Sequence, residues 1–194
     1  MTLRLLARSR GISALALVVA MMLAMPLAAT PARAQDEPDG EFARSTIDLG
    51  VVVSDVEKAA KFYTGAIGFT EIDGFSVPGD FAADAGLTDS QPLTIRVFVL
   101  GEGASATRLK LMQLPQVDSK KSDNAFIHSQ LGFSYLTIYI NDTNAAMARL
   151  TKAGVKPIAK GPVVLPEGFP EGVFLTVVRD PDGNLIELVG PKKE

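Results

Sequence analysis

The sequence contains no cysteine, no tryptophan and a single histidine, His128. The absence of cysteine excludes disulfide bonds, a thiolate nucleophile, and cysteine-ligated zinc or iron–sulfur centres. A single histidine excludes the multi-histidine metal sites that most zinc enzymes use. The chain nevertheless has 194 residues, 47% of them hydrophobic, which is enough for one domain with a substantial core.

Acidic residues are missing from the first 34 positions, which carry four arginines. The remaining chain has 15 basic and 22 acidic residues, so its net charge is −7 against −3 for the whole sequence. An acidic body of this kind argues against nucleic acid and against an anionic membrane surface as partners.

The N-terminal segment has the order of a secretory signal peptide. Three arginines precede an apolar run over residues 12–24, and Ala32-Arg33-Ala34 has the small side chains that signal peptidase requires. We therefore predict a signal peptide over residues 1–34, cleaved after Ala34, and a periplasmic or secreted protein that leaves the membrane after cleavage. An uncleaved anchor is the alternative, because residues 11–29 approach the length of a membrane span. Residues 35–45 are polar and are predicted to be a disordered lead-in.

Hydrophobic periodicity predicts the same order of elements twice, and Val53 aligns with Ile140 at an offset of 87 positions. The first half is predicted to contain a strand, a helix ended by Gly68 and three strands, over residues 46–53, 56–67, 70–77, 93–100 and 107–114. The second half is predicted to repeat them over residues 133–140, 143–153, 155–164 (interrupted by prolines and a glycine), 173–179 and 184–189.

Local signals mark the boundaries of these elements. Ser54 and Glu57 have the spacing of a capping box at the start of the first helix. Residues 180–183 (DPDG) predict a type I turn with proline at its second position. Two long loops are expected, over residues 78–92 and 115–131.

The sequence VSDVEKAAKFY over residues 53–63, followed by IGF, resembles the opening of the glyoxalase/bleomycin-resistance/extradiol-dioxygenase superfamily, also called vicinal oxygen chelate (VOC). The segment DPDGNLIEL is similar to the closing signature of that family. The resemblance spans one domain over residues 46–190, with modules at about 46–114 and 133–190 and a tail at 191–194. It implies an α+β fold in which two βαβββ modules pair into a half-open β-barrel with helices outside. Family members often dimerise, so a homodimer is one open alternative.

In metal-using members of this family, four ligands lie at the start of the first strand and the middle of the last strand of each module. They are usually histidine or glutamate, but the positions here hold Asp48, Lys110, Tyr135 and Glu187. A lysine ammonium has no lone pair for a metal, and a tyrosine ionises only near pH 10. We therefore expect no cofactor, with a divalent metal held by the two carboxylates as the alternative.

Two carboxylates that converge in a pocket require a cation or a proton between them. We therefore predict an ionic cluster of Asp48, Lys110 and Glu187, which would receive a small polar ligand through charge-assisted hydrogen bonds. The predicted ligand-binding residues are Asp48, Lys110, Tyr135, Glu187, Tyr139 and Arg96.

Phe169 lies in a segment over residues 165–172 that is either a lid or a wide hairpin connection.

Three functions are compatible with these residues. The first is a metal-independent protein that binds a small molecule, as drug-sequestering resistance proteins do. The second is a glyoxalase-like lyase or isomerase, with Glu187 as catalytic acid and base. The third is an interaction module of the cell envelope. The sequence does not decide whether the protein is an enzyme.

Overall fold

The computed structural model describes residues 44, 46–103 and 106–194. The predicted signal peptide and nearly all of the predicted lead-in lie outside these residues. Within the described part of the chain, no helix combines the length and the apolar character needed to cross a membrane.

The first module forms a four-stranded sheet with strand order β1-β4-β3-β2. β1 runs parallel to β4, and the other two pairs are antiparallel. A short π-helical turn, η1, continues α1 directly. The elements are β1 (Asp48–Val52), α1 (Val56–Phe62), η1 (Tyr63–Ile67), β2 (Thr70–Val77), α2 (Gly79–Asp84), β3 (Leu93–Leu100) and β4 (Thr107–Met112).

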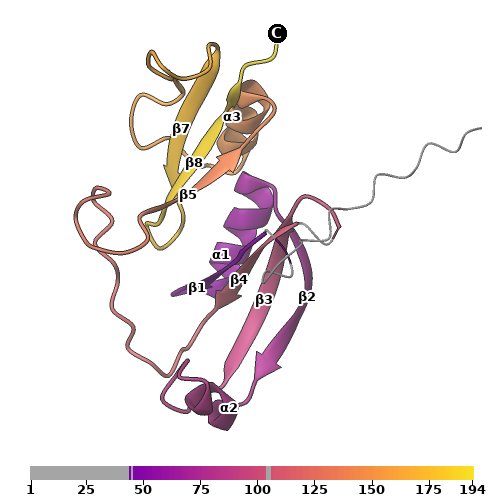
Figure 1. The fold of residues 1–194 in the computed structure, drawn as a ribbon, viewed down its shortest axis with the longest axis vertical. Coiled ribbons are helices and arrows are strands. Elements are labelled where there is room, and N and C mark those ends of the chain that lie inside the picture. Colours follow the sequence, from indigo (N-terminus) through magenta and orange to yellow (C-terminus); the bar gives the residue numbers. More distant parts are fainter. Residues whose placement is uncertain (1–43, 45, 104–105) are drawn as a thin grey trace, which may run out of the picture. The chain divides into compact units, whose positions relative to one another are not determined.

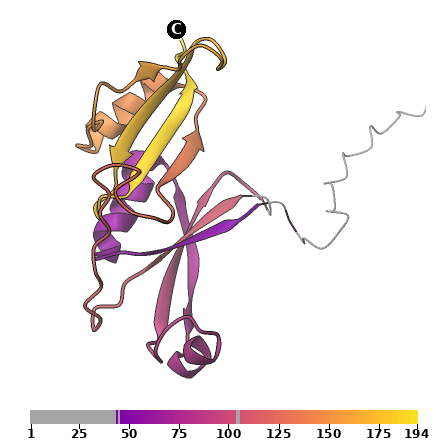
Figure 2. The same cartoon turned by 60° about the vertical axis from the view of Figure 1, so that its left-hand side comes forward.

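The second module repeats this topology with strand order β5-β8-β7-β6, and β5 again runs parallel to the last strand. Figures 1 and 2 show the two sheets as separate units that do not join into a closed barrel. The predicted α+β fold of two βαβββ modules is confirmed. The elements are β5 (Tyr135–Tyr139), α3 (Thr143–Lys152), β6 (Val163–Val164), β7 (Val173–Arg179) and β8 (Leu185–Pro191).

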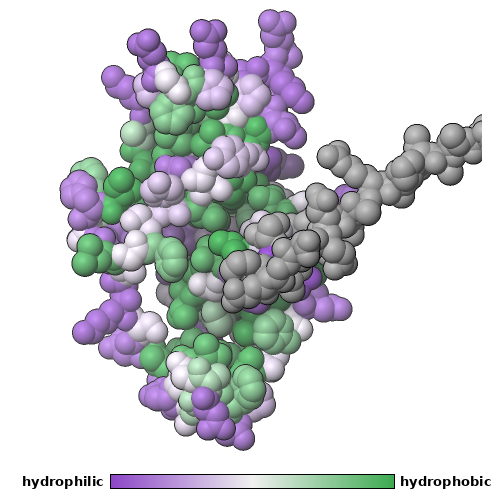
Figure 3. Space-filling view, in the orientation of Figure 1, coloured by the Kyte–Doolittle hydropathy of each residue, from purple (hydrophilic) through white to green (hydrophobic). Residues whose placement is uncertain are grey.

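Two expectations about chain segments were wrong. The strand expected over residues 155–164 is reduced to the two residues of β6. Pro157 and Pro162 have no N–H to donate to a neighbouring strand. Ile158, between them, donates one backbone hydrogen bond to Val177 at 3.0 Å, but the regular ladder begins after Pro162. The loop expected over residues 78–92 contains α2, and Phe81 and Leu87 in this segment are exposed. Figure 1 shows α2 at the lower end of the molecule, and hydrophobic side chains gather at that end in Figure 3.

The cap of α1 also differs from the predicted capping box. Asp55 is the N-cap residue, and its carboxylate accepts a hydrogen bond from the backbone N–H of Lys58 at 2.9 Å. Ser54 is one residue too early for this role, because the cap must directly precede the first helical residue. Its hydroxyl donates instead to Asp182 of the second module.

Two glycines are required by the backbone of the first module. Gly68 ends η1 with a φ of 100°, a left-handed conformation that favours glycine. Gly74 lies at a bulge in β2, where an added Cβ would clash with the carbonyl oxygen of Ile95 on β3. The bulge therefore depends on the missing side chain.

One hydrophobic core is built from both modules. It joins buried residues of α1 and η1, such as Phe62 and Ala66, to Ala146 and Leu150 of α3. Two polar contacts reinforce the junction: the Tyr63 hydroxyl donates to Asp180 at 3.0 Å, and Nε of Arg149 donates to the carbonyl of Ala66 at 2.9 Å. A second, smaller cluster around Ile95 and Val97 covers the other face of the first sheet.

Candidate functional site

The first half of the candidate site is an ion pair across β1 and β4. These strands pair with Gly50 opposite Lys110, so Asp48 and Lys110 lie on the same face of the sheet. Nζ of Lys110 lies 2.8 Å from Oδ2 of Asp48, and the guanidinium of Arg44 lies 2.8 Å from Oδ1. The Lys110 ammonium, followed by Arg44, holds the pKa of Asp48 below its usual value, against the opposing effect of burial.

Lys110 is partly enclosed at this position. Its side chain is 30% exposed, whereas that of Asp48 is 13% exposed. Its ammonium also lies 6.0 Å from the centre of the Phe75 ring on β2, within the range of a cation–π contact. The covalent cation of Lys110 therefore neutralises the carboxylate at this position.

The second half of the site lies on the sheet of the second module. Glu187 on β8 accepts a hydrogen bond of 2.6 Å from the hydroxyl of Thr137 on β5. Tyr135 and Tyr139 flank Thr137 on the same face and are both exposed. These four side chains share a cavity of about 700 Å³, whose other lining residues are Ile140, Leu165, Phe169, Pro170, Val173, Leu175, Val189, Gly190 and Pro191.

The loop between the modules reaches one end of this face. His128 stacks on the ring of Phe126, with ring centres 5.5 Å apart. Both residues line a second cavity of about 220 Å³, together with Tyr135 and Glu187. Phe169, from the segment predicted to be a lid or a hairpin, lines the larger cavity and is exposed.

The six predicted ligand-binding residues are therefore divided among three places. Asp48 and Lys110 meet on the first sheet, whereas Tyr135, Tyr139 and Glu187 line the cavity on the second. Among the described residues, no ion pair joins Lys110 to Glu187.

Arg96 lies away from both groups. Its guanidinium lies near the ring of Phe98 and binds the carboxylates of Glu71 and Glu57, each at 2.7 Å. Because Phe98 belongs to the core beneath the helix, Arg96 lies on the helix-covered face of the first sheet.

The residues at the four family positions do not fit a divalent metal. Lys110 is an ammonium already engaged with Asp48, which leaves no lone pair at one position and an occupied carboxylate at another. Within residues 44, 46–103 and 106–194, no group of three or more metal-ligating side chains comes together.

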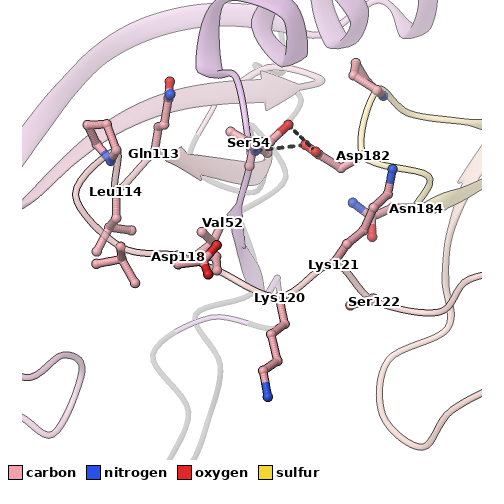
Figure 4. Close-up of a pocket in the computed structure, with 15 residues that line it drawn as sticks. Val52, Ser54, Gln113, Leu114, Asp118, Lys120, Lys121, Ser122, Asp182 and Asn184 are labelled. Carbon is pink, nitrogen blue, oxygen red and sulfur yellow. Dashed lines mark hydrogen bonds between the residues drawn. The ribbon is translucent and has the colours of Figure 1, made fainter.

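A separate polar cavity of about 470 Å³ lies where the end of β1, the loop after β4 and the turn over residues 180–184 meet. Figure 4 shows its hydrogen bonds, in which the backbone N–H and the hydroxyl of Ser54 both donate to Asp182. Lys120 points away from the other labelled side chains, whereas Lys121 lies beside Asn184. None of the six predicted ligand-binding residues lines this cavity.

Two residues of the site were missed by reasoning from the sequence. Thr137 lies between Tyr135 and Tyr139 on the alternating face of one strand, and this periodicity could have identified it. Arg44 precedes the first predicted strand, so no strand pattern indicates that it pairs with Asp48.

Comparisons with known proteins agree with this topology. Residues 46–188 match the family model described as Glyoxalase/Bleomycin resistance protein/Dioxygenase superfamily. A search of curated protein sequences gives no significant match.

Several solved structures are similar in fold. A glyoxalase family protein from Bacillus cereus is 22% identical with a TM-score of 0.62, over 80% of this chain and 99% of that one. A glyoxylase/bleomycin resistance protein/dioxygenase domain from Frankia is 15% identical with a TM-score of 0.54, over 79% and 95%. A point mutant of glyoxalase I from Zea mays is 19% identical with a TM-score of 0.54, over 76% of this chain and 46% of that one.

Proposed function

Because the chain belongs to the glyoxalase/bleomycin resistance protein/dioxygenase superfamily, we propose that it is an exported protein that binds a small polar organic molecule without a metal ion. The observation that carries this proposal is the contact of 2.8 Å between Lys110 and Asp48. It puts a permanent ammonium where metal-using relatives place a metal ligand, and the pair neutralises itself. Metal-dependent lyase and ring-cleaving reactions would therefore lack the metal ion that they require.

The cavity on the second sheet supports a particular kind of ligand. The half-buried carboxylate of Glu187 and the hydroxyl of Thr137 provide polar contacts on its floor. Tyr135 and Tyr139 add flat aromatic surfaces, and Leu165, Val173 and Leu175 are apolar. A molecule with an amino or hydroxyl group on an aromatic or alicyclic ring matches this lining.

A glyoxalase-like lyase or isomerase is the second candidate, favoured by the position of Glu187 inside a cavity. A carboxylate there could act as acid and base on a bound substrate. Against this assignment, Glu187 pairs with the neutral hydroxyl of Thr137, and no second titratable residue lines the larger cavity except tyrosines.

Metal analysis tests the central part of the proposal. Protein purified without chelators is expected to contain well under one equivalent of Mn, Fe, Co, Ni or Zn, and addition of these ions should leave its melting temperature unchanged. One tightly bound equivalent that is lost in Asp48→Asn or Glu187→Gln would contradict the metal-free proposal.

A thermal-shift screen with amines, hydroxy acids, thiol adducts and aromatic drugs tests ligand binding, because a ligand that binds only the folded state raises its stability. A true ligand of the cavity should lose most of its effect in Glu187→Gln and in Tyr139→Ala. The matched control is Glu102→Gln, which removes an exposed carboxylate in the turn between β3 and β4. Turnover of a stabilising ligand, lost in Glu187→Gln, would favour the enzyme instead.

We also propose that the site is completed by a second copy of the chain. In the described part of the chain, no ion pair and no shared cavity joins Asp48 and Lys110 to Glu187. A homodimer that apposes the first sheet of one copy to the second sheet of its partner would assemble these residues.

We further propose that the mature chain begins at Gln35. The intact mass of protein recovered from the cell envelope or medium checks the N-terminus. A mass that includes residues 1–34 would contradict cleavage.

A further inference from the structure

A large groove lies on the helical side of the molecule, away from the candidate site. It runs between α1 and η1 of the first module and α3 of the second, and its volume is about 930 Å³. Its floor includes the buried side chains of Phe62 and Ala66, and its walls include Ala153, Val155 and Ile158. None of the residues proposed to bind the ligand lines this groove.

The rim of this groove is strongly basic, although the chain after residue 34 is acidic. The cations come from α1, from α3 and the segment after it, and from the end of β7. Asp180 is the one carboxylate among the lining residues, and it already accepts hydrogen bonds from Tyr63 and Asn184. The six cations are Lys58, Lys61, Arg149, Lys152, Lys156 and Arg179.

These cations have no neutralising partners in the described part of the chain. Its ion pairs involve only Arg44, Arg96 and Lys110 as cations. Six cations against the single carboxylate of Asp180 leave a net positive charge around the groove, which is unusual on a protein with an excess of acids.

The two arginines are held in place by backbone carbonyls. Arg149 donates to the carbonyl of Ala66. Arg179 donates to the carbonyls of Asn124, Gly183 and Ala125 at 2.6, 2.8 and 3.0 Å. Its side chain lies on the same face of β7 as Val177, away from the helices. A carbonyl positions a guanidinium without neutralising it, so the charge of Arg149 remains available to an anion in the groove, whereas the guanidinium of Arg179 is bound by the loop and turn carbonyls. A positioned guanidinium is well suited to carboxylate, sulfate or phosphate groups.

We propose that this groove is a second binding site, for a small amphipathic anion with one acidic head group and an apolar body. The basic rim is complementary to the head group, and the apolar floor and walls are complementary to the body. The volume lies within the range of about 300–1,000 Å³ that is typical of small-molecule sites. A nucleic acid fits less well, because the one aromatic residue that lines the groove, Phe62, is buried and offers no ring for a base to stack on.

Calorimetric titration of the mature protein with decanoate tests the site. Saturable binding of one decanoate per chain is expected, and the affinity should rise by up to about fourfold per methylene from octanoate to dodecanoate. Decyltrimethylammonium, which has the same tail and the opposite charge, should not bind to the groove.

Charge reversal locates the site. Lys61→Glu/Lys152→Glu changes one exposed lysine on each side of the groove and should weaken decanoate binding about tenfold or more. Lys160→Glu/Lys193→Glu makes the same change in net charge at exposed positions outside the groove and should change the affinity less than about twofold. Equal melting temperatures of the two double variants show that both are folded.

Several results would overturn the proposal. One is the absence of saturable decanoate binding, and another is an equal loss of affinity in the two double variants. Binding that is lost in Tyr139→Ala but retained in Lys61→Glu/Lys152→Glu would place decanoate in the cavity of the second sheet. Binding to phosphatidylglycerol vesicles without binding of monomeric decanoate would mean that the basic groove contacts a membrane surface instead.

Discussion

At the residue scale, Asp48 and Lys110 show how far strand periodicity can take a prediction. Both residues fall on one face of predicted strands, and the family positions name them together, so their proximity was predicted and is seen at 2.8 Å. Glu187 was expected in the same cluster, but it accepts its hydrogen bond from Thr137. The sequence shows which face a residue occupies, whereas the distance between two sheets depends on packing that the sequence does not display.

The pH dependence of Asp48→Asn tests the ion pair. Because the folded pKa of Asp48 is lowered, its stabilising effect is fully present above the unfolded pKa of about 3.9 and is lost as the pH falls through the lower folded pKa. At pH 7 the variant should be less stable in urea by on the order of 1 kcal/mol. The difference from the wild type should shrink below about pH 4. A constant difference down to pH 2 would contradict the assignment.

At the element scale, the helices and most strands follow the sequence pattern, and the exceptions have local causes. Gly68 ends its helix as expected, with a φ of 100°, and Gly154 follows α3 with a φ of 72°. The strand predicted over residues 155–164 is reduced to β6, because prolines have no N–H to donate to a strand ladder. The cap of α1 is Asp55 because this residue directly precedes the first helical residue. Ser54 instead contacts Asp182, 128 residues away, and no local motif indicates such a contact.

Tyr63→Phe tests the junction between η1 and the turn over residues 180–184. The variant removes the buried hydrogen bond to Asp180 and should cost about 1–3 kcal/mol in urea denaturation. Tyr135→Phe, which alters an exposed tyrosine, is the control and should cost less than about 0.5 kcal/mol.

Alkaline pH gives an independent measure of the same contact. Burial, followed by the charge of Asp180, raises the pKa of Tyr63, so the folded state retains the proton above pH 10 while the unfolded chain releases it. The wild type should therefore lose stability as the pH rises above about 10, and Tyr63→Phe should lose less. Identical alkaline profiles would argue against a buried, neutral Tyr63.

At the scale of the whole molecule, the basic groove shows what composition conceals. The sequence predicts an acidic body without a basic patch, yet folding gathers six cations from three separate segments.

The large apolar side chains exposed on the two sheets, such as Val52, Phe75 and Tyr139, are equally dispersed in the sequence. Monomeric proteins rarely expose extensive apolar patches, which favours a covered surface in solution.

Analytical ultracentrifugation tests whether a second copy of the chain covers this apolar surface. The mature protein is expected to sediment as a dimer at micromolar concentration, because apposed sheets would bury these side chains. Phe75→Lys/Tyr139→Lys should shift it to the monomer, whereas Phe81→Lys/Leu87→Lys, which changes exposed residues in and beside α2, should leave the dimer intact. A monomeric wild type would contradict the proposed shared site.

The core that crosses from α1 and η1 to α3 also determines how the chain can be divided. Ala66 and Leu150 are each fully buried, in a cluster to which both modules contribute. A fragment that ends after β4 would expose its share of this surface to water, and so would a fragment that begins at β5. We expect each fragment alone to be insoluble and the two, co-expressed, to reconstitute the fold. Although the halves repeat one topology, each depends on the other to cover its apolar surface.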